Sequence, residues 1–206
     1  MSTIPADEGG KTSKEPRTER GRRTLRKLLD AAAIEFGEKG FHEASISGIT
    51  RRAGTALGSF YTYFDSKDEI FRALVSDMSG MVRARSAEEV KPGMNALEVE
   101  TAALTGFLKF AVEHKEIYRI VDEAEFVDPD SYREHYVSTA KRILSRLENG
   151  MASGEFRPGM GEAQAWALMG MYVFLGMRYA IMGEDRPVEE MVAVARGILE
   201  NGIRPE

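Results

Sequence analysis

Apolar residues recur at helical spacing along most of this chain. The first apolar stripe has members three or four positions apart: Leu25, Leu28, Leu29, Ala32 and Phe36. Such a stripe predicts an amphipathic helix, which begins near Arg20 and is closed by Gly37 and Gly40. Further long helices are predicted over residues 67–85, 97–114, 128–151, 162–182 and 188–201, with a shorter helix over residues 116–122. Helices are therefore predicted along most of the chain.

Two short helices are predicted between the first two long ones. Ser45 is placed to cap a helix over residues 46–53, which Gly54 ends. Thr55 is placed to cap a second helix over residues 56–64. Two short helices joined by a tight turn have the spacing of a helix-turn-helix motif.

The second short helix has two different sides. At about 100° per residue, Phe60 and Phe64 share one side and Leu57 and Tyr61 flank them, so this side packs inward. The opposite arc carries small and hydroxyl-bearing residues that can hydrogen-bond outward: Gly58, Ser59, Thr62 and Tyr63. Ser66 then caps the next helix and leaves Lys67 at an N-terminus that attracts anions.

Polar composition sets the first segment apart. Residues 1–18 contain Pro5, Pro16 and the pair Gly9-Gly10 but few apolar side chains, so we expect a disordered arm. The expected organisation is therefore this arm, a helix-turn-helix domain over residues 19–65, and a larger helical domain over residues 66–206.

Charge is distributed unevenly. The whole chain has 28 Lys and Arg against 33 Asp and Glu, but residues 11–30 have eight against three. A basic segment on an acidic body is compatible with a polyanion-binding end, and equally with a solvated charged face. The chain has no cysteine, which excludes disulfides and thiol chemistry. Because no apolar run reaches about 18 residues, we expect a cytoplasmic protein that does not enter a membrane.

The stretch "GFHEASISGITRRAGTALGSFYTYFDSKDEIFRAL", preceded by "TLRKLLDAAAIEFGEKG", resembles the DNA-binding signature of the TetR (AcrR-type) transcriptional regulators. The resemblance covers about residues 20–74. It implies an all-α homodimer with two DNA-binding heads and a C-terminal effector domain, most often a repressor that a small hydrophobic or amphipathic ligand releases from its operator. No cofactor is implied.

The resemblance also implies which residues contact duplex DNA. The expected DNA-binding residues are Arg20, Arg22, Arg23, Ser45, Ser47, Leu57, Gly58, Ser59, Tyr61, Thr62, Tyr63 and Lys67. Tyr61 and Lys67 are the expected phosphate contacts. The chain departs from the usual pattern at Ala44, Thr50, Ala56 and Leu57, and residues 57–64 contain no Arg, Lys, Asn or Gln for bidentate base contacts. Operator choice is therefore expected to depend on DNA shape and phosphate positioning.

Two surfaces are expected in the C-terminal domain. Its middle helices are expected to line an effector pocket with Phe107, Phe110, Tyr118, Phe126, Tyr132, Tyr136, Met169, Tyr172 and Arg178. The last two helices mix small and large apolar residues, which allows close helix approach. By resemblance to the family they are expected to form the dimer interface through Trp166, Gly170, Val173, Phe174, Met177, Met191, Ala195, Ile198 and Leu199.

Two other function classes remain open. A small helical enzyme is disfavoured because His42, His114 and His135 are scattered and no HExxH or phosphate-binding loop occurs. His114 and His135 with nearby acids could hold a metal, but we expect none. A helical ligand-binding or interaction module without DNA binding is the other alternative, and salt-dependent DNA binding separates it from a regulator.

Overall fold

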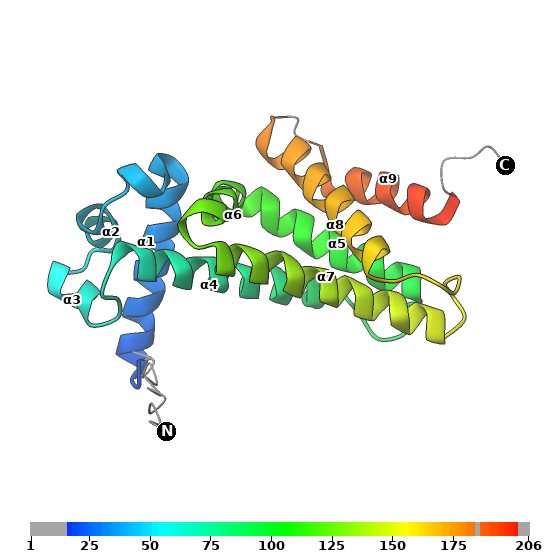
Figure 1. The fold of residues 1–206 in the computed structure, drawn as a ribbon, viewed down its shortest axis with the longest axis horizontal. Helices are drawn as coiled ribbons and strands as arrows, with labels where there is room; N and C mark the ends of the chain where they lie inside the picture. Colours follow the sequence, from blue (N-terminus) through cyan, green and yellow to red (C-terminus); the bar gives the residue numbers. More distant parts are fainter. Residues whose placement is uncertain (1–15, 184–185, 202–206) are drawn as a thin grey trace, which may run out of the picture.

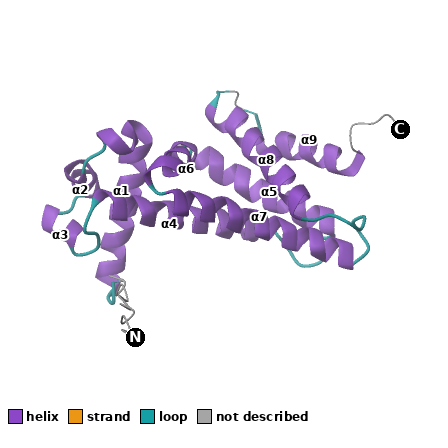
Figure 2. Cartoon of the chain, viewed as in Figure 1, coloured by secondary structure: helices purple, strands orange, loops and turns teal. Residues whose placement is uncertain are grey.

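The computed structural model describes residues 16–183 and 186–201, and within these ranges the chain forms helices and no strand (Figure 2). The helices are α1 Glu19–Glu43, α2 Ile46–Ala53, α3 Leu57–Tyr61, α4 Lys67–Glu88, α5 Ala96–Glu113, α6 Glu116–Val127, α7 Pro129–Ala152, α8 Glu162–Gly176, the π-helix η1 Met177–Ile181 and α9 Val188–Asn201. The all-α prediction is confirmed. Most of the predicted disordered arm, residues 1–15, lies outside the described residues.

Helices α1, α2 and α3 form a head at one end of the molecule (Figure 1). As predicted, the Ser45 hydroxyl accepts a hydrogen bond from the Gly48 amide at 3.0 Å, and Gly54 ends α2 in the left-handed conformation with φ 64°. The head therefore has the predicted helix-turn-helix arrangement.

Two local predictions in the head differ from the structure. Helix α3 is shorter than residues 56–64, because the amides of Tyr63 and Phe64 both donate to the Phe60 carbonyl and the chain turns after Tyr61. Its N-cap is Ala56 without a side-chain bond, rather than Thr55. Gly37 does not end α1 but lies inside it, where a Cβ atom would come within 2.5 Å of the Glu116 Cβ, so glycine permits the close approach of α6.

A buried carboxylate joins the first two helices. Glu35 on α1 is fully buried, and it accepts a hydrogen bond from Arg52 Nε of α2 at 2.6 Å and from Lys39 Nζ at 2.7 Å. The same guanidinium also pairs with the exposed Glu38. Both salt bridges to Glu35 compensate the cost of removing its charge from water.

Long helices α4, α5 and α7 extend from the head, with α8 and α9 at the far side (Figure 1). One apolar core runs without interruption from α1 through α4 to α6, so the head and the body share it. A second core joins α5, α7, α8 and α9. Inside this second core Glu100 accepts two bonds from Arg146 and one from the Tyr172 hydroxyl, so its buried charge is paired.

Candidate DNA-binding head and ligand cavity

The outer side of the helix-turn-helix motif carries most of the predicted DNA-contact residues. Leu57 and Tyr61 are each 50% exposed, and Gly58, Thr62 and Ser47 are exposed beside them. Phe60 and Phe64 are buried, as the helical projection predicts. This side therefore offers hydroxyl groups and one large apolar side chain to a groove of DNA.

Tyr63, Ser59 and Ser45 are less free than predicted. Tyr63 is half-buried against the core of the head, and Ser59 is half-buried as well. The Ser45 hydroxyl is used as the helix cap and lies 3.2 Å from the Ser47 hydroxyl. Tyr63 was placed on the outer arc by extending a helix to residue 64, and the chain leaves the helix before reaching it.

The arginines at the start of α1 divide into two kinds. Arg22 and Arg23 both pair with Glu19, at 2.9 and 3.2 Å, and all three side chains are exposed. Arg20 is exposed without such a pair among the described residues. Because exposed ion pairs are weak, Arg22 and Arg23 can exchange Glu19 for a phosphate at little cost.

Lys67 is engaged inside the head rather than free. Its ammonium donates to the carbonyl oxygens of Phe41, His42 and Ala44 at 2.6, 3.1 and 3.0 Å, and it lies 4.5 Å from the centre of the Phe41 ring. The three carbonyls belong to the end of α1, where no helical partner remains for them. In this structure Lys67 therefore caps α1, and the predicted phosphate contact would require it to leave these carbonyls.

Replacing Lys67 by methionine is accordingly expected to lower the free energy of unfolding by about 1.5–3 kcal/mol, the usual value for hydrogen bonds to a charged group. The salt dependence of DNA affinity should stay unchanged. Urea unfolding and DNA titrations at several salt concentrations measure the two effects, with Lys27→Met on exposed α1 surface as the matched control. An unchanged stability together with a salt slope reduced by about one would instead identify Lys67 as a phosphate contact.

Helix α6 fastens the head to the body. Arg119 Nη1 donates to the carbonyls of Gly37 and Glu38 at 3.1 and 3.0 Å, and a Glu123 oxygen accepts the Phe41 amide at 2.6 Å. These contacts lie near Gly40, whose non-helical φ of 78° interrupts α1. A movement of α6 would therefore be transmitted to the end of α1.

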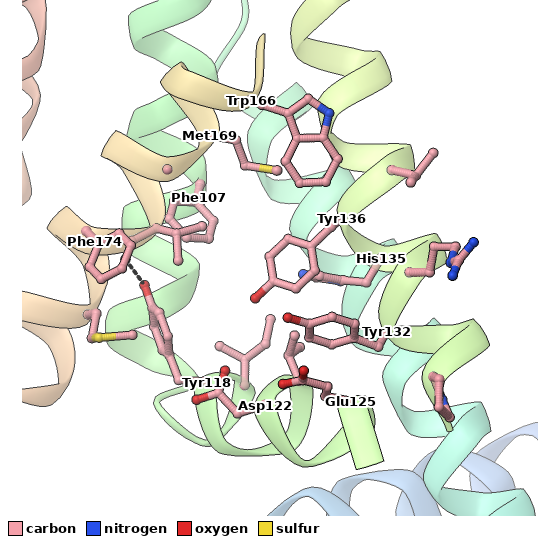
Figure 3. Close-up of a pocket in the computed structure, with 18 residues that line it drawn as sticks. Phe107, Tyr118, Asp122, Glu125, Tyr132, His135, Tyr136, Trp166, Met169 and Phe174 are labelled. Carbon is pink, nitrogen blue, oxygen red and sulfur yellow. Dashed lines mark hydrogen bonds between the residues drawn. The ribbon is translucent and has the colours of Figure 1, made fainter. Parts of the chain in front are cut away.

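The opposite side of α6 faces a cavity of about 620 Å³ between α5, α6, α7 and α8 (Figure 3). We call it the aromatic cavity. It is lined by Phe107, Ile117, Tyr118, Val121, Asp122, Glu125, Pro129, Tyr132, Arg133, His135, Tyr136, Val137, Trp166, Met169, Gly170, Val173, Phe174 and Met177. Its volume lies in the range of small-molecule sites.

Five of the nine predicted pocket residues line this cavity: Phe107, Tyr118, Tyr132, Tyr136 and Met169. Phe126 does not, because it lies on the outer side of α6 and is 83% exposed. Phe110 is fully buried in the first core, where its ring lies 4.5 Å from that of His114. Tyr172 lies in the second core with its hydroxyl on Glu100, and Arg178 is exposed on η1.

Sequence reasoning missed four polar residues of the cavity, which are Asp122, Glu125, Arg133 and His135. Asp122 and Glu125 lie four and seven positions after Tyr118, and His135 lies three after Tyr132, so helical spacing alone places each on a lining face. Burial and the neighbouring Glu125 raise the pKa of Asp122. Burial, together with the negative groups nearby, raises the pKa of Tyr136 to about 12. The tyrosines are therefore neutral hydroxyl donors near neutral pH.

His135 connects the cavity to α4. Its Nδ1 atom lies 2.6 Å from the Ser79 hydroxyl of α4, and its ring contacts the Tyr136 ring at 5.1 Å between centres. Burial, followed by the charge of Arg142, lowers the pKa of His135 to about 4. The imidazole is thus neutral near pH 7, and it joins the cavity wall to the helix that begins at the head.

The predicted interface residues fall into three groups in the single chain. The aromatic cavity is lined by five of them: Trp166, Gly170, Val173, Phe174 and Met177. Of these, Trp166 and Phe174 are also exposed. Met191 and Ala195 are buried in the second core, since α9 lies against α5. These two are internal packing residues. Ile198 is exposed and Leu199 is half-buried.

The described residues also bear on metal binding and on membrane insertion. No group of three or more histidine, cysteine or acidic side chains is arranged there to hold a metal ion. No helix among the same residues is long and apolar enough to cross a bilayer.

A helix-turn-helix head fastened to a helical body with a ligand-sized cavity defines a DNA-binding transcriptional regulator. Comparison with known proteins agrees. The family model of the bacterial regulatory proteins of the tetR family matches residues 28–74. Residues 28–74 therefore carry the DNA-binding domain of this family of regulators.

Relatives resemble the chain over nearly its whole length. The HTH-type transcriptional regulator YdgC of Bacillus subtilis is 29% identical over 91% of this chain and 96% of its own. The transcriptional repressor KstR2 of Rhodococcus jostii is 27% identical over 98% of each. Among solved structures, the regulator FadR of Bacillus subtilis in complex with stearoyl-CoA superimposes with a TM-score of 0.77, covering 87% of this chain and 99% of its own at 20% identity. This last similarity shows the shared fold.

Proposed function

We propose that this protein is a dimeric repressor which a small apolar or amphipathic effector releases from its operator by occupying the aromatic cavity. The observation that carries the proposal is the position of α6. One side of this helix lines the cavity, and another side contacts the head. Tyr118, Val121 and Asp122 line the cavity, whereas Arg119 and Glu123 hold the end of α1. KstR2 is a repressor by name, and the FadR structure holds stearoyl-CoA, which supports a ligand-controlled repressor.

The same cavity is coupled to the head by a second route through α4. His135 contacts Ser79 in the middle of α4, and Arg72 near its start binds Asp128 at 2.8 Å beside the first turn of α7. A ligand that separates α6 from α7 would therefore act on both contacts between α7 and α4, the one at His135 and the one at Asp128. If it binds better to the conformation with wrongly spaced heads, it lowers DNA affinity by that difference in free energy.

The lining favours an effector that is mostly apolar and carries a hydrogen-bonding or positively charged end. Phe107, Trp166 and Phe174 supply apolar area at one part of the wall (Figure 3). Another part of the wall carries the hydroxyl groups of Tyr132 and Tyr136 and the carboxylates of Asp122 and Glu125 (Figure 3). Aromatic faces and carboxylates both attract cations and repel anions.

Filling the cavity is expected to abolish regulation while leaving repression. Gly170 lines the cavity, and a Cβ atom there would meet no atom within 4 Å, so Gly170→Phe can project a ring into it without a clash in the helix. The variant should bind operator as the wild type does, and should lose effector response by at least about tenfold, since the ring occupies the site. Gly170→Ala, which fills almost nothing, is the matched control.

The measurement needs an operator and an effector, and both can be obtained from the protein. Selection of bound genomic fragments gives the operator, and mass spectrometry of the purified protein gives the bound small molecule. Fluorescence anisotropy then follows operator release. A Gly170→Phe protein that still responds like the wild type would place the effector elsewhere, and DNA affinity without salt dependence would refute operator binding through the head.

A further inference from the structure

A second cavity of about 470 Å³ lies between α4, α5, α7 and α8, and we call it the arginine cavity. Its apolar wall includes Val82, Leu104 and Ile143. It meets the aromatic cavity only at shared wall residues: Phe107, Met169 and Val173. Both cavities have mainly apolar linings, but their charged groups differ. The aromatic cavity has two carboxylates, Asp122 and Glu125, and one arginine, Arg133, whereas the arginine cavity has Arg83, Arg142 and Arg146 and no acidic lining residue.

The three arginines differ in their partners. Arg146 is neutralised by Glu100, which accepts its Nε and Nη2 atoms at 2.5 and 3.1 Å. Arg142 is half-buried, yet its side chain makes one hydrogen bond, from Nη2 to the Thr139 hydroxyl at 2.7 Å, and no ion pair with any described residue. Arg83 on α4 is exposed and likewise has no ion-pair partner in the described chain.

The surroundings of Arg142 leave its positive charge uncompensated. Burial lowers the pKa of Arg142, and the charges of Arg83 and Arg146 lower it further, while the opposing effect of Glu134 is smaller. The nearby His135 is neutral near pH 7, so its ring does not compensate the charge of Arg142. A half-buried guanidinium with four unused donor positions is costly unless an anion meets it.

We propose that the arginine cavity binds a carboxylic acid with a hydrocarbon tail. The carboxylate would lie between Arg142 and Arg83, whose planar guanidinium groups suit its two oxygens, and the tail would lie among Val82, Leu104 and Ile143. The aromatic cavity is a poorer alternative for the same molecule, because its two carboxylates, Asp122 and Glu125, outnumber its one arginine, Arg133. The proposal gives the protein a ligand site separate from the aromatic cavity.

Occupation of this site would reach the head through α4. Arg83 lies on α4 and Arg142 on α7, so one carboxylate would join two helices that carry no ion pair to each other at this level. The acid would thereby fix the distance between them.

Decanoate is a suitable probe, with decanol as the uncharged molecule of the same chain length. Calorimetric titration of the full-length protein should show decanoate binding more tightly than decanol by at least about tenfold. Arg142→Met, which keeps the length of the apolar stem, should lose this advantage. Arg133→Met is the matched control, because Arg133 lies on the same helix but lines the aromatic cavity, and it should bind decanoate as the wild type does.

A second measurement separates binding from folding. Decanoate should raise the melting temperature of the wild type and of Arg133→Met, but not that of Arg142→Met. The ligand-free Arg142→Met protein should melt no lower than the wild type, since the substitution removes an unpaired, half-buried charge.

Three results would overturn the proposal: equal affinity for decanol and decanoate, undiminished decanoate binding by Arg142→Met, or no binding of decanoate at about 1 mM. Loss of decanoate binding in Gly170→Phe would do so as well, because it would place the acid in the aromatic cavity. That last result would leave the proposed repressor function standing, so failure of the two proposals can be distinguished.

Discussion

Glu35→Ala is expected to lower the free energy of unfolding by about 3–5 kcal/mol, the usual cost of breaking a buried ion pair from one side. The carboxylate is fully buried and holds Arg52 of α2 against α1, with Lys39 as its second partner. Without it, Arg52 loses its buried partner, and its guanidinium is left with the exposed Glu38 as its partner on α1. Because the core of the head continues into α4 and α6, the loss should be felt in global unfolding.

The matched control is Glu38→Ala. Glu38 pairs with the same Arg52 guanidinium, but its side chain is 57% exposed, so its removal should cost about 0–1 kcal/mol. Urea unfolding followed by circular dichroism measures both values. Equal losses in the two variants would show that burial of Glu35 contributes nothing beyond a surface ion pair.

The same residue should make stability depend on pH. Burial acts to raise the pKa of Glu35, but the hydrogen bonds and charges of Lys39 and Arg52 outweigh it and hold the pKa below its ordinary value. A carboxyl with a depressed folded-state pKa contributes stability that is present above its unfolded pKa and is lost as pH falls through the folded value. The difference in stability between wild type and Glu35→Ala should therefore shrink on acidification below about pH 4.5.

Helix positions were predictable because caps and periodic apolar residues are local signals. Ser45, Gly54 and Ser66 cap or end helices where the sequence indicates. The errors arose where contacts distant in sequence decide. Gly37 was taken as a helix end, although its use is to admit Glu116 of α6, which lies 79 positions later.

Roles of single side chains were less predictable than helices. Lys67 at a helix start has the appearance of an anion site, but the carbonyls of Phe41, His42 and Ala44, more than twenty positions earlier, occupy its ammonium. Phe126 and Phe110 were chosen as pocket residues for their type alone, and the helical face on which each lies excludes them. Asp122 and Glu125, polar residues at the right spacing, do line the cavity.

Ile198→Asp is expected to convert the protein from a dimer to a monomer and to weaken operator binding by about 10²–10⁴-fold. Ile198 on α9 is 43% exposed, and the exposed apolar side chains of Trp166, Phe174 and Val194 lie on α8 and α9 as well. An apolar surface of this kind is typical of an association surface, and the proposed dimer covers it. A carboxylate in the proposed interface would have to be desolvated without a partner, so the chains should separate.

Ile34→Asp is the matched control, because Ile34 is also an isoleucine on a helix, is 47% exposed, and lies on α1 of the head. It should remain a dimer. Light scattering at micromolar concentration reports the mass, and anisotropy with the selected operator reports binding, which requires two linked heads to engage two half-sites together. A monomeric wild-type protein would contradict the proposed dimer, and an Ile198→Asp protein that stays dimeric would exclude this part of α9 from the interface.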